Sequence, residues 1–228
     1  MMRHSPAAER NRQPILQALQ QLLPARGVAL EVASGTGQHV ACFAQGLPGW
    51  TWQPSDATPD AFASIDAWSA QAGVANVRAP VVLDVLSPCW PAQDDAFDQP
   101  FDAIFCANML HIAPWATCAG LMRGAARHLA TDGSLLTYGP YLEQDVQTAP
   151  GNLEFDRSLR GSNRAWGIRA LEDVAQVAQI AGLRLHQRIP MPANNLLLVF
   201  RRPVHGKPVA PPVTPLACLL NERSPQPQ

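Results

Sequence analysis

The stretch Val28-Ala29-Leu30-Glu31-Val32-Ala33-Ser34-Gly35-Thr36-Gly37-Gln38 decides the fold. Its first five residues are mostly apolar, as in a buried strand, and small residues follow at once. Behind them, apolar residues recur at helical spacing: Val40, Phe43, Ala44 and Leu47. The stretch therefore predicts a strand, a glycine turn and a helix, which is the opening unit of an α/β sheet.

Strands and helices alternate along the chain on both sides of this unit. A leading helix is predicted over 10–23, with Pro14 near its first turn. Seven apolar runs predict strands at 28–32, 51–55, 81–84, 101–106, 134–138, 183–189 and 196–201. The last two runs are too close for a helical crossover, so they predict an antiparallel hairpin at a sheet edge. The expected fold is α/β, a doubly wound, mostly parallel seven-stranded sheet with a C-terminal antiparallel hairpin.

The chain divides into one domain and a tail. Residues 1–202 are predicted to form a single domain, in which 1–27 contain the leading helix. Residues 139–169 are rich in Gly, Pro, Asn, Asp and Arg and predict an irregular, lid-like insertion with at most a short helix near 155–160. The segment 203–228 carries seven prolines and is predicted to be a flexible tail.

Composition excludes several classes of protein. Seventeen basic and eighteen acidic residues give a net charge of -1, so no overall field attracts nucleic acid or anionic membranes. The five cysteines are scattered and form no C-x-x-C pair, which argues against a disulfide framework or a zinc module, and no metal is expected. No apolar run approaches the roughly 18 residues of a membrane span, and the first residues lack a signal-peptide core. A cytoplasmic location is the expectation.

Acidic and small residues follow three neighbouring strands of the predicted sheet. Asp56 ends the second strand, Asp84 ends the third, and Asn108 follows the fourth. Because parallel strands bring their carboxyl ends to one edge, these residues should line one crevice with the glycine turn. Asp56 could accept hydrogen bonds from both hydroxyls of a ribose, and Asp84 could accept one from an adenine amino group. The turn lacks the third small position of the dinucleotide fingerprint, which argues against a nicotinamide cofactor.

Together these motifs resemble class I S-adenosylmethionine (SAM) dependent methyltransferases over roughly residues 28 to 201. The resemblance implies SAM as cofactor and S-adenosylhomocysteine (SAH) as product. Ala33 departs from the class pattern, which has glycine at this position. Carried over residue by residue, the cofactor-binding positions are Glu31, Ala33, Ser34, Gly35, Thr36, Gly37, Asp56, Asp84, Val85, Cys106, Ala107 and Asn108.

A closer resemblance is to the methyltransferase-like protein 26 family. Its motifs are similar to the stretches 5–11, 31–39, 155–160, 166–169 and 191–196 of this chain. The resemblance implies a SAM-binding fold and supplies no substrate.

Methyl transfer from a sulfonium depends mainly on positioning and desolvation, so it demands no particular catalytic residue. His111, in the loop after the fourth strand, is the candidate general base, and the alternative is that it packs beneath the following helix. The insertion and the hairpin supply the candidate substrate-binding residues Tyr138, Tyr141, Asn152, Arg160, Trp166, Arg169 and Asn194. Arginines suit a small anionic or planar substrate, although pairing with Asp156 could instead order the loop.

The leading hypothesis is therefore a SAM-dependent methyltransferase acting on a small molecule. A nucleic-acid methyltransferase is disfavoured because the sequence has no basic stripe and no recognition domain. The alternative outside catalysis is a SAM- or SAH-binding sensor or partner subunit, since binding and transfer share nearly all their residues. The acceptor, the oligomeric state and the pathway stay open.

Overall fold

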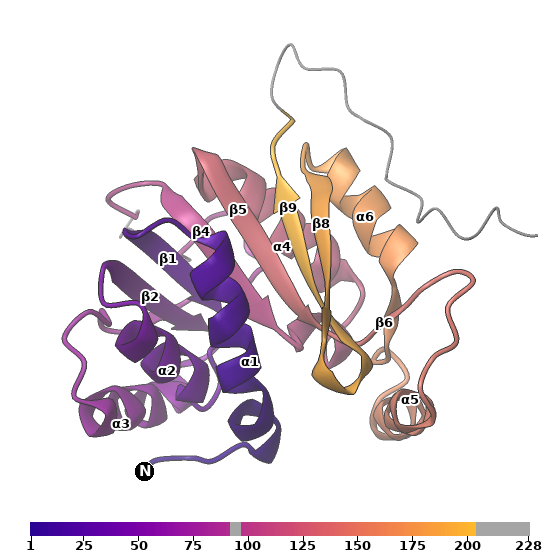
Figure 1. Ribbon diagram of the computed structural model, residues 1–228, viewed down its shortest axis with the longest axis horizontal. Helices are drawn as coiled ribbons and strands as arrows, with labels where there is room; N and C mark the ends of the chain where they lie inside the picture. Colours follow the sequence, from indigo (N-terminus) through magenta and orange to yellow (C-terminus); the bar gives the residue numbers. More distant parts are fainter. Residues whose placement is uncertain (92–96, 204–228) are drawn as a thin grey trace, which may run out of the picture.

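The computed structural model describes residues 1–91 and 97–203, and its centre is a seven-stranded sheet of order β3-β2-β1-β4-β5-β9-β8 (Figure 1). Strands β3, β2, β1, β4 and β5 run parallel, and β9 pairs antiparallel with both β5 and β8. The predicted fold class and the C-terminal hairpin are confirmed. The strands are β1 (Gly27–Val32), β2 (Trp50–Asp56), β3 (Val81–Val82), β4 (Phe101–Ala107), β5 (Leu129–Gly139), β8 (Arg184–Met191) and β9 (Asn195–Arg201).

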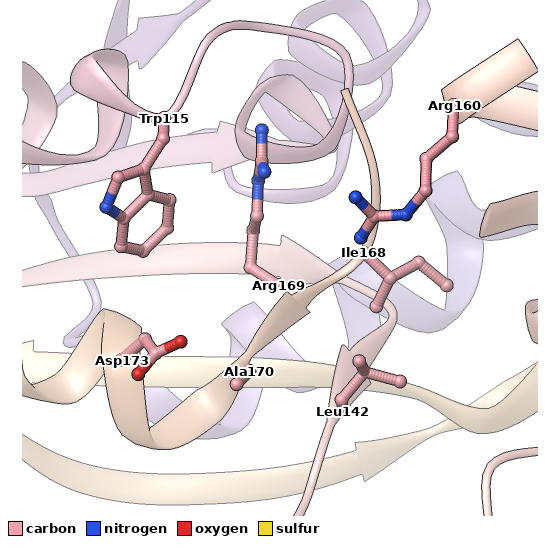
Figure 2. Close-up of a pocket in the computed structure, with 7 residues that line it drawn as sticks. All are labelled: Trp115, Leu142, Arg160, Ile168, Arg169, Ala170 and Asp173. Carbon is pink, nitrogen blue, oxygen red and sulfur yellow. The ribbon is translucent and has the colours of Figure 1, made fainter. Parts of the chain in front are cut away.

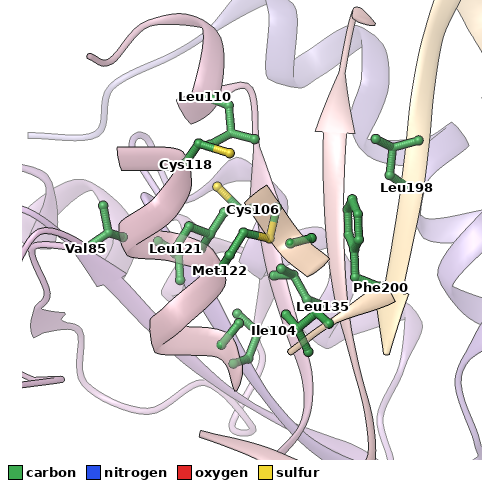
Figure 3. Close-up of a cluster of buried hydrophobic side chains, with 14 of the residues drawn as sticks. Val85, Ile104, Cys106, Leu110, Cys118, Leu121, Met122, Leu135, Leu198 and Phe200 are labelled. Atoms are coloured by element: carbon green, nitrogen blue, oxygen red, sulfur yellow. The ribbon is translucent and has the colours of Figure 1, made fainter. Parts of the chain in front are cut away.

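Helices cover both faces of this sheet because side chains alternate along each strand. Ala29 of β1 packs in the cluster that contains α1, α2 and α3, whereas Leu30 and Val32 pack in the cluster that contains α4 and α6. Figure 3 shows part of the second cluster, where Leu121 and Met122 of α4 lie against the sheet. The helices are α1 (Pro6–Leu22), α2 (Gln38–Gly46), α3 (Phe62–Ala72), α4 (Ala116–His128), α5 (Pro150–Ser162) and α6 (Leu171–Ile180), with short 3-10 turns η1 (Pro59–Ala61), η2 (Met109–His111) and η3 (Pro192–Asn194).

The leading helix begins earlier than the sequence predicts. Ser5 is its N-cap, with the hydroxyl accepting a hydrogen bond from the Ala8 amide at 3.3 Å, and Pro6 occupies the first turn. Pro14 therefore lies inside the helix, and its placement near the first turn was wrong. The apolar pattern starts late because, in the first turn, only Ala8 is buried.

The insertion is more regular than predicted. It contains the 13-residue helix α5, whereas at most a short helix near 155–160 was expected. Only Leu159 of this helix is buried, so the sequence shows no apolar stripe from which its length could be predicted. The strands β6 (Tyr141–Leu142) and β7 (Arg169–Ala170) pair in parallel and tie the two ends of the insertion together.

The tail predicted over 203–228 lies outside the described residues from position 204 onward. Among the helices that the structure describes, none combines the length and the apolar character needed to cross a membrane.

Candidate functional site

The turn after β1 is built from residues in the left-handed region of backbone space. The φ angles are +58° at Ala33, +57° at Gly35 and +87° at Gly37. A Cβ at Gly37 would lie 2.5 Å from the Cα of Ile65, so this glycine allows α2 to approach α3. At Gly35 the nearest atom to such a Cβ is the Ala33 carbonyl oxygen, 4.0 Å away. Space is therefore open above Gly35, where a ligand can reach the backbone.

Asp56 at the end of β2 joins the glycine turn directly. Its Oδ2 accepts a hydrogen bond from the Gly35 amide at 2.9 Å, and its Oδ1 accepts one from the Ala57 amide at 2.8 Å. The Ser34 amide donates to the Ser55 carbonyl at 2.8 Å. The turn and the carboxylate expected to hold a ribose therefore form one unit at the carboxyl edge of the sheet.

Glu31 lies beneath this turn with an unsatisfied carboxyl oxygen. The residue is 2% exposed, and no hydrogen-bond partner for Oε2 exists among residues 1–91 and 97–203. Burial, with a smaller contribution from the charge of Asp56, raises the pKa of Glu31 to about 8, and a hydrogen bond with Ser34 opposes the shift. A buried acceptor without a donor costs free energy, so the arrangement fits a ligand that brings an N–H donor or a positive charge.

Asp84 was predicted to end the third strand, but β3 stops at Val82, and the segment that follows it places Asp84 beside Asp56. The Leu83 amide donates to the Asp56 carbonyl oxygen at 2.8 Å, and Asp84 is the next residue. The Asp84 side chain accepts a hydrogen bond from the Leu86 amide at 2.9 Å and is exposed. Val85 is buried against α4. An exposed carboxylate beside a buried valine is compatible with the expected adenine site.

The predicted residues at the carboxyl end of β4, Cys106 and Ala107 in the strand and Asn108 after it, have different surroundings. The Cys106 side chain packs in the core with Cys118 of α4, and burial raises the pKa of its thiol. Ala107 and Asn108 are half-buried, and the Asn108 amide donates to the Tyr138 carbonyl at 2.8 Å. Asn108 has a φ of +58°. Ala107 and Asn108 thus reach the carboxyl edge, whereas the thiol of Cys106 does not.

His111 is sealed beneath the insertion. The residue is fully buried, and neither ring nitrogen has a partner in the part of the chain that the structure describes. Its ring centroid lies 5.2 Å from that of Tyr141, and a Cβ at Gly139 would lie 2.3 Å from Nε2. Burial and then the charge of Arg169 lower the pKa of His111 to about 3, and the nearby Gly167 backbone and the charge of Asp156 act in the opposite direction. The imidazole is therefore neutral at neutral pH.

The structure does not bring the predicted substrate-binding residues into one cluster. Tyr138, the penultimate residue of β5, lies on the α1 side, whereas Tyr141 is buried in the other core cluster and donates to the Thr137 hydroxyl at 2.8 Å. Asn152 of α5 donates to the Asn194 carbonyl oxygen at 2.9 Å and so joins the insertion to the hairpin. The other members lie elsewhere: Trp166 near the end of the insertion, and Arg160 and Arg169 around a pocket beside Trp115.

Two stretches quoted for the family resemblance contact each other through residues that were not predicted as a site. Gln38 is fully buried; its Oε1 accepts from the Ser5 amide at 2.5 Å and its Nε2 donates to Glu9 at 2.9 Å. His39 and Asn11 form a second pair, 2.7 Å between Nε2 and Oδ1. These bonds fix the start of α1 against the glycine turn. These contacts between residues 5–11 and 35–39 join polar side chains, so the spacing of apolar residues in the sequence could not predict them.

Three solved structures illustrate the likeness of this fold to known proteins. CalO1, described as a methyltransferase in calicheamicin biosynthesis and solved with SAH bound, gives a TM-score of 0.69 at 16% identity, covering 86% of this chain and 54% of that chain. Mitomycin 7-O-methyltransferase MmcR gives 0.69 at 16% identity, with 85% and 54% covered. An O-methyltransferase family 2 protein from Planctomyces limnophilus, in complex with apigenin, gives 0.67 at 22% identity, with 86% and 65% covered.

The sheet order and the glycine turn at its carboxyl edge, together with these neighbours, define the fold of class I SAM-dependent methyltransferases. The chain spans 54% to 65% of the length of those three chains. It belongs to the family described as "Protein of unknown function (DUF938)", whose model matches residues 2–202. The resemblance to methyltransferase-like protein 26 stays a prediction.

Proposed function

We propose that the protein is a SAM-dependent methyltransferase that acts on a small-molecule acceptor. The main observation in support of this proposal lies at the carboxyl edge of β1 and β2. There, open backbone at Gly35 and the Asp56 carboxylate accompany a buried Glu31 oxygen that has no hydrogen-bond partner among the described residues. When bound there, SAM would supply a methyl group already activated by its sulfonium.

Each of these residues has a distinct part in holding the cofactor. The Asp56 carboxylate accepts hydrogen bonds from the ribose hydroxyls, and Asp84 accepts one from the adenine amino group. The buried oxygen of Glu31 accepts a hydrogen bond from the amino group of the methionine moiety. The exposed backbone at Gly35 allows close approach. Asp56 already accepts a hydrogen bond from the Gly35 amide, so the turn and the carboxylate are in place before any ligand enters. This lowers the entropy lost on binding.

The acceptor would lie above the ends of β4 and β5, beside Asn108 and Tyr138. A small molecule is favoured because the net charge is near zero and because two neighbours are described as an O-methyltransferase of mitomycin and one bound to apigenin. His111 can act as general base only after the insertion 139–169 moves, since its ring is sealed in this conformation. The insertion is then the lid of the site.

The alternative is a SAM- or SAH-binding protein without transferase activity. The sealed imidazole of His111 favours it, because no proton can pass from an acceptor to a ring that it cannot touch. Such a protein would bind the cofactor and leave every acceptor unmethylated.

Calorimetric titration of SAM and SAH tests the proposal. We expect the wild type to bind both and Asp56→Ala to lose binding, because the ribose contacts and the anchor of Gly35 disappear together. Asp66→Ala is the matched control, since this exposed carboxylate lies on α3 outside the site and should leave binding intact. A wild type that binds neither compound contradicts the proposal.

Transfer is measured separately with SAM labelled in its methyl group. Incubation with a small-molecule extract should yield a labelled product in the wild type and none in Asp56→Ala. Cofactor binding without any labelled product would favour the sensor over the enzyme.

A further inference from the structure

A pocket of about 360 Å³ opens on the side of the sheet covered by α4 and α6 (Figure 2). Trp115 at the start of α4, Arg160 of α5 and Asp173 of α6 stand around it together with Arg169. Its apolar wall is formed by Leu142, Ile168 and Ala170. None of the residues expected to bind SAM lines this pocket, so it is a separate feature of the molecule.

Arg169 is held rigidly at the centre of the pocket. Its Nε donates to the Leu110 carbonyl at 2.9 Å, and its Nη2 donates to the carbonyls of Ala113 and Ala165 at 2.8 and 2.7 Å. Its guanidinium carbon lies 5.5 Å from the ring centroid of Trp115. Within residues 1–91 and 97–203, Nη1 has no acceptor and no carboxylate forms an ion pair with this arginine. The cation is thus fixed without an ion pair to any carboxylate of the described residues, and the charge of Asp156 acts on it from farther away, raising its pKa.

Arg160 places a second positive charge beside the first. Its Nε donates to Asp156 at 2.8 Å, while its two terminal nitrogens lack acceptors in the described chain. Burial and then the charge of Arg160 lower the pKa of Arg169, as expected where two cations repel each other, and the charge of Asp156 partly offsets this effect. Figure 2 shows the two guanidinium groups on the same side of the pocket, with Asp173 across from Arg160. An anion between the arginines would relieve this repulsion.

We propose that this pocket binds a small aromatic monocarboxylate. The carboxylate would bridge the unused N–H groups of Arg160 and Arg169, because guanidinium matches carboxylate geometry. The ring would rest on the apolar wall. Asp173 excludes a second negative charge and accepts a hydrogen bond from an amino or hydroxyl group on the far end of the ring. The volume suits one ring, at the low end of the range for small-molecule sites.

The inference rests on the pocket alone and does not depend on SAM binding. The probe is 4-aminobenzoate, titrated into the nitrogen-labelled protein while the indole N–H signals are followed by NMR. The chain has six tryptophans, so Trp115→Phe identifies the signal of Trp115. We expect a saturable shift of that signal, with a dissociation constant of about 1 mM or tighter.

Arg160→Gln should weaken binding of 4-aminobenzoate by about tenfold to a hundredfold, the range for a hydrogen bond to a charged group. Arg157→Gln is the matched control, because Arg157 is an exposed arginine of the same helix that does not line the pocket. Unchanged indole signals elsewhere show that each variant is folded. Arg160→Lys keeps the charge without the planar fork and should bind with intermediate affinity.

Three results would overturn the inference. They are the absence of a saturable shift in the wild type, equal affinity in the wild type and Arg160→Gln, and equal affinity for the neutral analogue 4-aminobenzamide. The last would mean that the pocket recognises the ring and not the carboxylate.

Discussion

A single methyl group at position 33 strains the turn that carries the candidate cofactor site. Ala33 has a φ of +58°, a conformation in which a Cβ costs about 1–2 kcal/mol. Glycine removes this cost, but its more flexible unfolded chain lowers stability by about 0.5–1 kcal/mol. We expect Ala33→Gly to raise the free energy of unfolding by about 0.5–1 kcal/mol, measured by urea denaturation.

Ala70→Gly is the control for this substitution. Ala70 is exposed within α3, so glycine there should lower the free energy of unfolding by about 1 kcal/mol. If Ala33→Gly destabilises the protein as Ala70→Gly does, position 33 is not strained.

The position of several candidate site residues could be predicted from the ends of the predicted strands. Glu31, Asp56 and Asp84 could be placed at one edge because each lies at the carboxyl end of a recognisable apolar run or directly after it. Burial of His111 was one of the two alternatives, but its cover beneath the insertion could not be predicted, because the covering groups Gly139, Tyr141 and Gly167 lie far along the chain. Sequence also could not show that Gly37 serves helix packing, since its neighbour Ile65 belongs to another element.

At the level of the elements, α4 packs so closely on the segment after β3 that position 120 of the helix has no room for a side chain. A Cβ at Gly120 would lie 2.4 Å from the Val85 carbonyl oxygen. We expect Gly120→Ala to lower the free energy of unfolding by about 1–3 kcal/mol, because the backbone of one element must move. Calorimetry should also show weaker SAM binding, since Val85 and Asp84 would shift.

Gly161→Ala provides the comparison for this prediction. Gly161 lies in α5, and apart from its chain neighbours and the backbone of its own helix, no atom of the described residues lies within 4 Å of the position that its Cβ would take. Alanine there should leave stability unchanged or raise it by up to about 1 kcal/mol. A loss of stability at Gly161 comparable with that at Gly120 would contradict the packing explanation.

Elements with an apolar stripe were the predictable ones. The helices α4 and α6 and the central strands β1, β4, β5 and β9 contain the buried apolar residues from which they were predicted. The helix α5 was missed because it rests on the molecule through Leu159 and polar contacts. The first turn of α1 was missed because it is fixed by hydrogen bonds of Ser5 and Glu9 with Gln38.

For the whole molecule, three buried groups with large pKa shifts, His39, His111 and Glu31, dominate the dependence of stability on pH. Burial lowers the pKa of His111 to about 3 and of His39 to about 4, from 6.5, so the unfolded chain binds more protons below about pH 6.5. Burial raises the pKa of Glu31 from 4.5 to about 8. Between these two values, the folded chain holds a proton that the unfolded chain has lost. Below about pH 6.5 the two histidines outweigh the one glutamate, and stability falls with acid. Between about pH 6.5 and 8 it falls as pH rises.

We therefore expect the free energy of unfolding to be greatest near pH 6.5, as measured by urea denaturation across a pH series. His111→Gln should reduce the slope below this maximum by about 1.4 kcal/mol per pH unit, the value for one proton. Tyr141→Phe removes a hydrogen bond beside the same ring without removing a titrating imidazole, so its profile should shift downward and keep its slope. Equal slopes in the wild type and His111→Gln would exclude a neutral buried imidazole.

The antiparallel strand β9 is the last strand of the sheet in the chain, yet it stands inside the sheet between β5 and β8. During synthesis, β5 and β8 are therefore complete while the place between them is empty, and both expose unpaired backbone groups and apolar side chains. The core closes only when Leu196 to Phe200, all buried in the finished sheet, have emerged from the ribosome. Chains terminated before this strand keep an open β5 edge, which makes them templates for aggregation and substrates for chaperones.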